Sequence, residues 1–414
     1  MADIKIIRKD VNVGYPDGED PVPISGLATQ AVPGMNTTIY YGAAVDPYIV
    51  VSPKNPCVII VAWQNDRLST KGALEAGIAY SHNRGKSWCR VVVPFQITIG
   101  GVVNRITQPS LAYSADGARV FLTVMAANTT RNPESITQSG IATSYSDDDG
   151  VTWGKPVFNI SEPFSIEEGT VDDLPTITAD PKCANNIYVV WERFVAPRTS
   201  HANTYLSRSN DKGASWFPAV AIYDATFDLK KSGLSNGKEA DNQTLFNTVV
   251  PVENNLYNYM TRIYASPNAT SEQYANDTFP YKYTDSDIAF IVSKDNGISW
   301  GNEAKVVTTT SYNASVFTGG YCYDINGNIV GGIGTLVRTG SPGAFAVATS
   351  NDNIYVVYQD PFHRSDLLNQ ISLRYSKNGG RSWSCPIMVN KTPQNSPNPQ
   401  AFTPIFAITK GYLV

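Results

Sequence analysis

The sequence predicts an all-β protein in which one four-stranded antiparallel unit repeats around a ring, as in a six-bladed β-propeller. Three observations predict this fold. Five segments share the pattern S-x-[DN]-x-G-x-[ST]-W, pairs of β-rich runs joined by turn residues precede them, and alternating apolar runs flank them. Such repetition is typical of propellers, because radial packing protects the edges of short sheets.

The five shared segments, called boxes here, end on five of the seven tryptophans of the chain. They are SHNRGKSW (81–88), SDDDGVTW (146–153), SNDKGASW (209–216), SKDNGISW (293–300) and SKNGGRSW (376–383). We expect each box to form a tight turn, because an Asp or Asn side chain accepts backbone N–H bonds and glycine supplies a positive φ. The tryptophan is expected to plug this turn into the adjoining core.

Each unit follows the order strand, hairpin, strand, loop, strand, box turn, strand. In the first unit YIVVSPKNPCVIIVAW supplies the hairpin pair, and GIAYS and CRVVVPF flank the box. The five units span 41–95, 105–158, 173–223, 245–307 and 316–389.

The C-terminal AFTPIFAITKGYLV begins the sixth blade, which we expect both termini to close, with help from the N-terminal segment 1–40. No helical periodicity or long linker interrupts the units, so 1–414 is predicted to be a single domain.

Composition limits the partners. The 414 residues carry a net charge of −4, and only 16% are charged, which argues against a nucleic-acid partner. No apolar run is long enough to span a membrane, so no membrane insertion is expected. The N-terminus lacks the apolar core of a signal peptide. We therefore expect a protein that is cytoplasmic, or is exported or assembled without a classical leader.

Cysteines and histidines give no sign of a metal site. The five cysteines share no short spacing, which predicts free and mostly buried thiols. The three histidines share no ligand spacing, and the acids before Gly150 do not fit a calcium loop. No cofactor and no metal are expected.

The five boxes resemble the Asp-box, or BNR, repeats of the sialidase-like six-bladed propellers, and the resemblance covers about 40–410. Two boxes depart from the pattern, with Asn83 and Asn378 in the Asp place. The family's sialidases also have a Phe/Tyr-Arg-Ile-Pro motif that this sequence lacks; its nearest match begins at Arg105. The resemblance implies a glycan-recognising protein, either an exo-glycosidase acting on terminal acidic sugars or a non-catalytic structural or adhesion module.

Candidate site residues follow from the propeller, in which loops entering first strands and leaving second strands gather on one face. The predicted catalytic residues are Asp66, Asp172 and Glu192, and the predicted substrate-binding residues are Arg67, Arg105, Arg193, Asp173 and Arg364. Arginines bind a carboxylate bidentately, and a carboxyl pair supplies acid and base. The alternative is that Asp66–Arg67 and Glu192–Arg193 are merely salt-bridged neighbours.

Tyrosines cluster around 255–285, where we expect an insertion. They are Tyr257, Tyr259, Tyr264, Tyr281 and Tyr283. They are predicted either to stack on sugars or to pack the inserted loop. The expected partners are a glycan or glycoconjugate and, for the non-catalytic alternative, other protein subunits of an assembly.

Overall fold

The computed structural model describes most of the chain. The described residues are 29–31, 38–69, 72–93, 95, 103–129, 136–163, 170–195, 201–234, 242–264, 285–310, 344–350, 353–360, 370–390, 401, 404–406, 408–409 and 412–413. They fall into two compact units: unit 1 comprises 1–164, 179–187 and 209–216, and unit 2 comprises 165–178, 188–208 and 217–414. The prediction of a single domain is not tested by this division.

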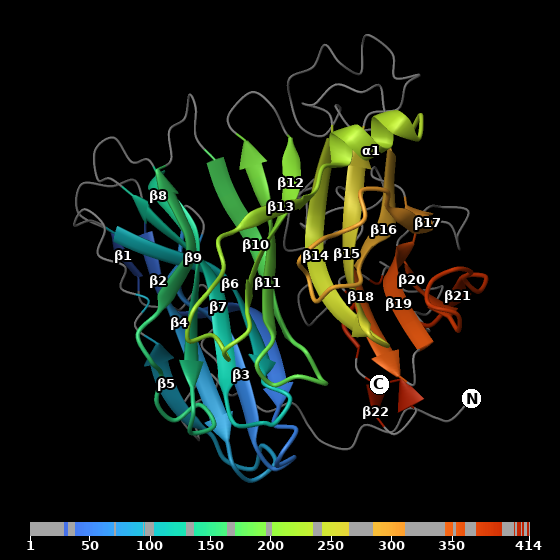
Figure 1. Cartoon of the computed structure of the whole chain (residues 1–414). Coiled ribbons are helices and arrows are strands. Elements are labelled where there is room, and N and C mark those ends of the chain that lie inside the picture. Colours follow the sequence, from blue (N-terminus) through green and yellow to red (C-terminus); the bar gives the residue numbers. More distant parts are fainter. Residues whose placement is uncertain are drawn as a thin grey trace, which may run out of the picture. The chain divides into compact units, whose positions relative to one another are not determined.

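Unit 1 contains one sheet in the order β1-β2-β3-β4-β6-β7-β8-β9, with β5 on the edge of β4 (Figure 1). The strands are β1 (Thr29–Ala31), β2 (Thr38–Val51), β3 (Ile59–Leu68), β4 (Ala73–Ser81), β5 (Cys89–Val93), β6 (Val103–Tyr113), β7 (Val120–Thr129), β8 (Ile136–Ser146) and β9 (Val157–Pro163). Strands β2–β5 and β6–β9 are two four-stranded antiparallel meanders.

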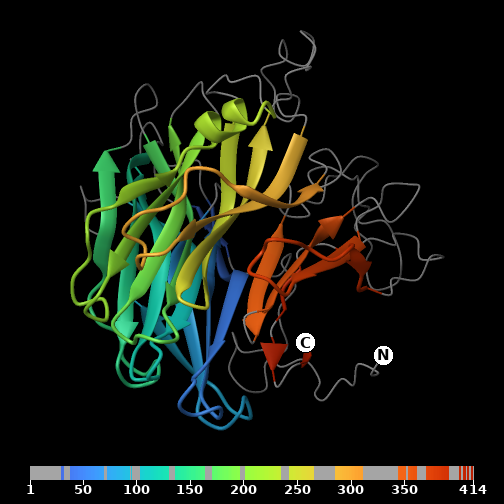
Figure 2. The ribbon, with the colours of Figure 1, turned by 45° about the vertical axis from the view of Figure 1, so that its right-hand side comes forward.

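Unit 2 contains a sheet in the order β10-β11-β12-β14-β15-β16-β17, with β13 on β12, and two smaller sheets, β18-β19-β20-β21 and β22-β23 (Figure 2). The strands are β10 (Thr170–Ala179), β11 (Ile187–Val195), β12 (Ala202–Ser209), β13 (Val220–Tyr223), β14 (Asn242–Val252), β15 (Asn255–Tyr264), β16 (Asp285–Ser293), β17 (Lys305–Thr310), β18 (Phe345–Ser350), β19 (Asn353–Asp360), β20 (Gln370–Ser376), β21 (Ile387–Met388), β22 (Ile408–Thr409) and β23 (Tyr412–Leu413). The turns between β10 and β11 (179–187) and between β12 and β13 (209–216) belong to unit 1.

The all-β fold and its antiparallel strands are confirmed, and the predicted meanders all appear as β2–β5, β6–β9, β10–β13, β14–β17 and β18–β21. A sixth blade stays a prediction. Its C-terminal part is the β22–β23 hairpin, whereas IKIIRKDVNV lies outside the described residues. Strand β1, at the end of the N-terminal segment, pairs with β2.

One helix was not predicted. Helix α1 (Ala225–Lys231) follows β13, and Asp224 caps it by accepting hydrogen bonds from the backbone N–H groups of Thr226 and Phe227. With seven residues it completes only two turns, which is too short for a periodic apolar pattern to identify it.

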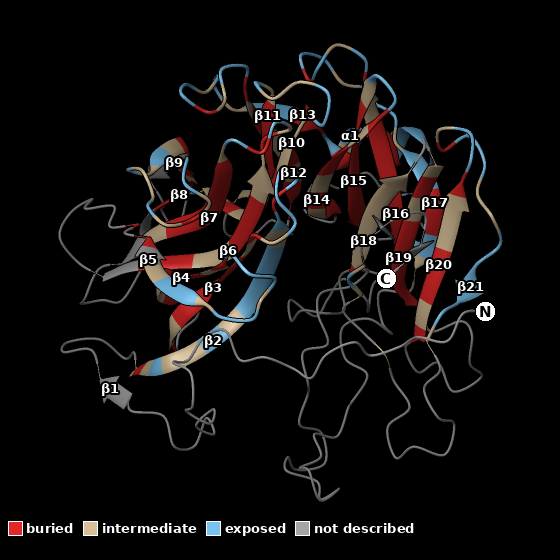
Figure 3. Ribbon diagram, turned by 90° about the horizontal axis from the view of Figure 1, so that it is seen from below, coloured by how far each residue is buried: buried red, intermediate tan, exposed pale blue. Residues whose placement is uncertain are grey.

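The core of each unit lies on the second and third strands of the meanders. Figure 3 shows β3 and β7 largely buried, whereas β2 is mostly intermediate or exposed. The unit 1 core gathers residues of β3, β4, β6, β7 and β8, among them Ile60, Ile78 and Leu122. In unit 2 the core includes Tyr188, Tyr259 and Phe290, all nearly inaccessible to solvent.

The tyrosine cluster was placed wrongly. Tyr257, Tyr259 and Tyr264 lie on β15 and are at most 7% exposed, so they are core residues rather than members of an inserted loop. Tyr257 and Tyr259 pack against Phe290. Tyr281 and Tyr283 lie outside the described residues.

The boxes form the predicted turns. In the second box Ser146 Oγ donates to Asp148, while the backbone N–H groups of Gly150 and Thr152 donate to Ser146 Oγ and Asp148 Oδ1, at 2.9 and 2.8 Å. Where asparagine replaces the acid, as at Asn83, its Nδ2 donates to the serine hydroxyl four residues later. The turn therefore tolerates this exchange.

Four of the five box glycines also pack closely against a side chain of a neighbouring meander: Gly150, Gly213, Gly297 and Gly380. Gly380 has φ +75°, and a Cβ there would lie 2.5 Å from Phe290; at Gly213, with φ +73°, it would lie 2.8 Å from Phe121. Only glycine meets both requirements. The box turns therefore pack one repeat against the next.

Four of the five cysteines are described, and all four are free. Cys89 and Cys385 are exposed and Cys57 and Cys183 are only partly buried, so the expectation of mostly buried thiols was wrong for the four described cysteines. Among the described residues, no helix is long and apolar enough to cross a membrane.

Candidate functional site

The predicted site residues lie on strands rather than in loops. Asp66 and Arg67 belong to β3, Arg105 to β6, Asp172 and Asp173 to β10, and Glu192 and Arg193 to β11. These strands are longer than the apolar pattern predicted, because backbone pairing continues through the polar residues that follow each apolar run. Arg364 lies outside the described residues.

In unit 1, Arg67 and Arg105 both lie close to Gly72. Arg67 donates to the carbonyl oxygen of Gly72 at 3.1 Å, and a Cβ added at Gly72 would approach Arg105 Cβ to 3.4 Å. Asp66 accepts a hydrogen bond from the backbone N–H of Gly42 at 2.8 Å. Arg67 also donates to Gln64 Oε1, at 2.5 Å. These contacts describe a polar cluster that holds β2, β3 and the turn before β4 together.

In unit 2, Asp172, Trp191 and Arg193 form a buried group. Asp172 Oδ1 accepts hydrogen bonds from Trp191 Nε1 at 2.6 Å and from Arg193 Nε at 2.8 Å, while Oδ2 accepts from a terminal nitrogen of Arg193 at 3.1 Å. The guanidinium carbon of Arg193 lies 4.4 Å from the centre of the Tyr205 ring. Arg193 therefore pairs with Asp172 across the strands, and the expected pairing with its neighbour Glu192 was wrong.

Glu192 lies next to this group and has a different environment. Its side chain is fully buried; Oε2 accepts a hydrogen bond from Asn247 Nδ2 at 3.3 Å, whereas Oε1 has no hydrogen-bond partner. Burial, followed by the nearby charge of Asp173, raises the pKa of Glu192 well above its usual value. Asp173 is itself only partly buried.

Backbone bulges bring these residues together. Leu174 on β10 and Phe246 on β14 have φ of 50° and 57°, rare for residues other than glycine, and both pack against Leu245 and Ile263. Two hydrogen bonds bind the strands side by side, from Thr176 Oγ1 to the Asn247 carbonyl and from Thr178 Oγ1 to the Val249 carbonyl, at 2.7 and 2.8 Å. Bulges of this kind re-aim side chains and concentrate at functional sites.

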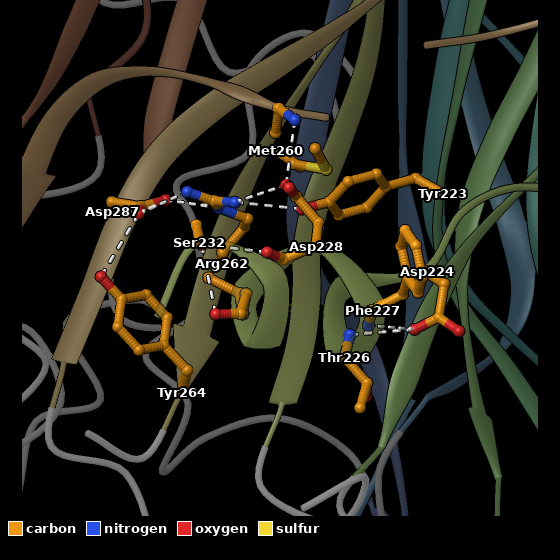
Figure 4. Close-up of polar contacts among 12 residues, drawn as sticks. Tyr223, Asp224, Thr226, Phe227, Asp228, Ser232, Met260, Arg262, Tyr264 and Asp287 are labelled. Carbon is orange, nitrogen blue, oxygen red and sulfur yellow. Dashed lines mark hydrogen bonds and ion pairs between the residues drawn. The ribbon is translucent and has the colours of Figure 1, made fainter. Parts of the chain in front are cut away.

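A second charged cluster in unit 2 is structural. Arg262 on β15 binds Asp287 bidentately at 2.8 and 2.7 Å and Asp228 of α1 at 2.9 Å, and Tyr223 and Tyr264 complete the group (Figure 4). Each carboxylate accepts several hydrogen bonds, including one from the backbone N–H of Ala304 to Asp228. The cluster is buried and well paired, and it fastens α1 to β15 and β16.

The part of the chain that the structure describes contains no group of three or more His, Cys, Asp or Glu side chains able to hold a metal ion. The candidate site lies on β10, β11 and β14, and we call it the β10–β11–β14 site. It consists of Asp173, Glu192 and Asn247, supported by the paired group Asp172, Trp191 and Arg193. Of these, sequence reasoning missed Trp191 and Asn247. For Asn247 the signal in the sequence was the absence of the proline that precedes the same kind of strand segment elsewhere, as at Pro109 and Pro175.

No protein-family model matches the sequence, and no curated protein matches it. Solved structures do match. The GH93 α-L-arabinofuranosidase of Fusarium graminearum, in complex with arabinobiose, is 14% identical with a TM-score of 0.52 over 88% of this chain and 84% of that chain. The α-L-arabinanase of Penicillium chrysogenum, complexed with arabinobiose, is 14% identical with a TM-score of 0.50 over 89% and 85%. These β-propeller glycosidases show the fold of this chain.

Proposed function

We propose that this protein is a carbohydrate-active β-propeller that binds a glycan at the β10–β11–β14 site and hydrolyses a glycosidic bond there. The observation that carries the proposal is Glu192, a buried carboxyl group with one oxygen free of hydrogen bonds and a raised pKa. A carboxyl group whose pKa is raised keeps its proton to a higher pH, which suits general-acid catalysis. The shared fold with two glycosidases supports the same conclusion.

The two carboxyl groups have complementary roles in this proposal. Glu192 gives its proton to the bridging oxygen as the bond between that oxygen and the anomeric carbon breaks. Asp173 takes a proton from the water whose oxygen bonds to the anomeric carbon. One water is consumed and two hydroxyl groups form, one on each product. Solvent then takes the proton from Asp173 and returns one to Glu192.

The arginine favours a neutral glycan over an acidic one. Two nitrogens of the Arg193 guanidinium already bind Asp172. The Asp172 carboxylate therefore neutralises the positive charge that would otherwise attract the carboxylate of an acidic sugar. In this proposal Asp172 and Arg193 are structural supports of the site. Arabinobiose, present in both similar structures, is the first ligand to test, and a sialoside tests the acidic-sugar alternative.

The test is hydrolysis of arabinobiose, longer arabino-oligosaccharides and a panel of chromogenic glycosides that includes a sialoside. We expect Glu192→Gln and Asp173→Asn each to lose about 100-fold or more in kcat. Glu303→Gln is the matched control, because Glu303 is exposed and pairs with the exposed Lys231. No hydrolysis of any glycan by the wild type would overturn the enzymatic role.

A second candidate is a glycan-binding or structural module without catalysis, within a larger assembly. The complete burial of Glu192 favours it, since a substrate reaches this carboxyl only after neighbouring side chains move. Calorimetry with arabinobiose separates the two: binding without turnover supports the module, and binding with turnover supports the enzyme.

The finer architecture belongs to the same proposal: a single domain over 1–414, six blades and a relationship to the sialidase-like Asp-box propellers. The five meanders and their box turns support it. A closed ring is expected to unfold in one cooperative transition, whereas two separate transitions in calorimetry would contradict a single domain.

A further inference from the structure

Asn247 occupies a special position in the repeat. The first strands β2, β6, β10 and β14 each contain a residue with left-handed backbone: Asp46, Gln108, Leu174 and Phe246. In the first three strands the next residue is proline (Pro47, Pro109 and Pro175), but in β14 it is Asn247. Proline has no polar side-chain group, so only the β14 bulge presents a hydrogen-bonding side chain at this place.

Four other strands hold Asn247. Its backbone carbonyl accepts a hydrogen bond from Thr176 of β10 at 2.7 Å. Its Oδ1 accepts from Thr204 Oγ1 of β12 at 2.8 Å and from Asn258 Nδ2 of β15 at 3.0 Å. Its Nδ2 donates to Glu192 Oε2 of β11. The side chain is fully buried, so these contacts fix its orientation.

The hydroxyl groups of Thr204 and Thr244 decide which atom donates to Asn247 Oδ1. Thr244 Oγ1 donates to the carbonyl oxygen of Ala202 at 3.2 Å, and a carbonyl can only accept. Thr244 therefore acts as an acceptor toward Thr204, whose single hydroxyl proton can go to Thr244 Oγ1 at 3.1 Å or to Asn247 Oδ1 at 2.8 Å. The contact with Asn247 is the shorter of the two. The amide oxygen of Asn247 therefore faces two donors, and its nitrogen faces Glu192.

We propose that Asn247 is a positioning residue for Glu192: by donating to Oε2 it makes that atom the carbonyl oxygen and leaves the acid proton on Oε1. This inference rests on the proposed function, in which Oε1 delivers the proton. In a carboxylic acid the carbonyl oxygen is the better acceptor, so a fixed donor selects which oxygen is protonated. If Oε1 carries the proton that is delivered to the substrate, it should not be hydrogen-bonded to another group of the protein, and it has no such partner among the described residues.

The charged surroundings of Glu192 are simple. Asp173 of β10 is the charge that acts on it, and β14 carries no titratable side chain. Arg193 and Asp172 form their own pair, and Arg193 points to the opposite face of β11 because neighbouring side chains alternate along a strand. Burial and the charge of Asp173 raise the pKa of Glu192, and Asn247 is the side chain that lowers it, together with the backbone N–H groups of Glu192 and Phe246.

The experiment measures the titration of Glu192 by NMR of the protein labelled with ¹³C at the glutamate carboxyl carbon, with the Glu192→Gln spectrum assigning the signal. Loss of the donor removes a hydrogen bond that favours the ionised form. We therefore expect Asn247→Leu to raise the titration midpoint by about one pH unit. Asn247→Asp, which keeps a polar group if the leucine variant fails to fold, is expected to raise it as well, because a carboxylate faces Oε2.

Asn65→Leu is the matched control, since Asn65 donates to Glu75 Oε1 at 2.7 Å in the same manner. It is expected to shift the titration of Glu75 and to leave that of Glu192 unchanged. A Glu192 midpoint that does not move in either folded Asn247 variant overturns the inference. The NMR titration needs no substrate, so it is independent of whether any glycan is hydrolysed. Where hydrolysis is found, a kcat pH profile that shifts with the NMR midpoint supports the inference, and an unshifted profile overturns it.

Discussion

Strands β3 and β11 occupy the same place in their meanders and begin their polar segments alike, with Trp63-Gln64 and Trp191-Glu192. In β3 the amide of Gln64 is fully used: Nε2 donates to Asp46 and Oε1 accepts from Arg67. In β11 the Oε2 of Glu192 accepts from Asn247, whereas Oε1 has no hydrogen-bond partner. The same buried position therefore holds a hydrogen-bonded amide in β3 and, in β11, a carboxyl group with one oxygen open to a ligand in the proposed function.

The tryptophans differ in a related way. Trp63 Nε1 donates to the neutral amide of Asn65 at 3.2 Å, whereas Trp191 Nε1 donates to the carboxylate of Asp172 at 2.6 Å. Hydrogen bonds to charged groups are shorter and stronger than neutral ones. The β11 network thus depends on charge, and the following variants test this dependence.

The largest effect is expected from Asp172→Asn. It leaves the buried Arg193 without its counter-charge, so the free energy of unfolding should fall by about 3–5 kcal/mol in urea denaturation. Asp147→Asn is the control, since Asp147 pairs with Arg119 but its side chain is 56% exposed. It should cost less than about 1 kcal/mol. Equal losses would show that burial does not distinguish the two pairs.

The fold could be predicted from the sequence because its signals are local and repeated. Each box carries its own turn chemistry within eight residues, so the meanders were found in order. The candidate site was predicted only in part. Asp172, Asp173, Glu192 and Arg193 were named from their places before or after apolar runs, but the Asp172–Arg193 pair and the contact of Asn247 with Glu192 join residues 21 and 55 positions apart. Such pairing depends on strand register and bulges, which composition does not specify.

Asn247 shows most clearly what could not be predicted from the sequence. Its difference from Pro47, Pro109 and Pro175 is visible in the sequence. Its meaning appears only when the left-handed residues align the four strands. Helix α1 and the buried tyrosines of β15 were missed for a similar reason, since tertiary packing decides their place.

The next effect comes from converting the β3 position to that of β11 with Gln64→Glu. The new carboxyl cannot donate to Asp46 when ionised, and two carboxylates then meet in a buried position. We expect the free energy of unfolding at neutral pH to fall by about 2 kcal/mol, and less below pH ~4, where the pair shares a proton. Urea denaturation at the two pH values measures this. A variant as stable as the wild type at neutral pH would show that Arg67 alone compensates the new charge.

The reverse change, Glu192→Gln, is expected to alter the pH dependence of stability. The folded-state pKa of Glu192 is raised above its ordinary value of 4.5. The associated stability is therefore complete below pH 4.5 and is lost as pH rises through the folded-state pKa. Glutamine does not ionise, so the variant should gain stability relative to the wild type by up to about 1.4 kcal/mol per pH unit in that window. Thermal unfolding from pH 4 to 9 tests this, and a constant difference would contradict the raised pKa.

The smallest effect compares two equivalent tryptophans. Trp191→Phe and Trp63→Phe each remove one indole N–H and a similar volume from a buried site, so their difference isolates the hydrogen bond. We expect the β11 variant to lose about 1 kcal/mol more than the β3 variant, because its N–H serves a carboxylate. In Asp172→Asn the acceptor is neutral, and adding Trp191→Phe to it should reduce the difference toward zero in a double-mutant cycle. If the two tryptophans cost the same in the wild type, charge does not distinguish the networks, and the empty oxygen of Glu192 alone separates β11 from β3.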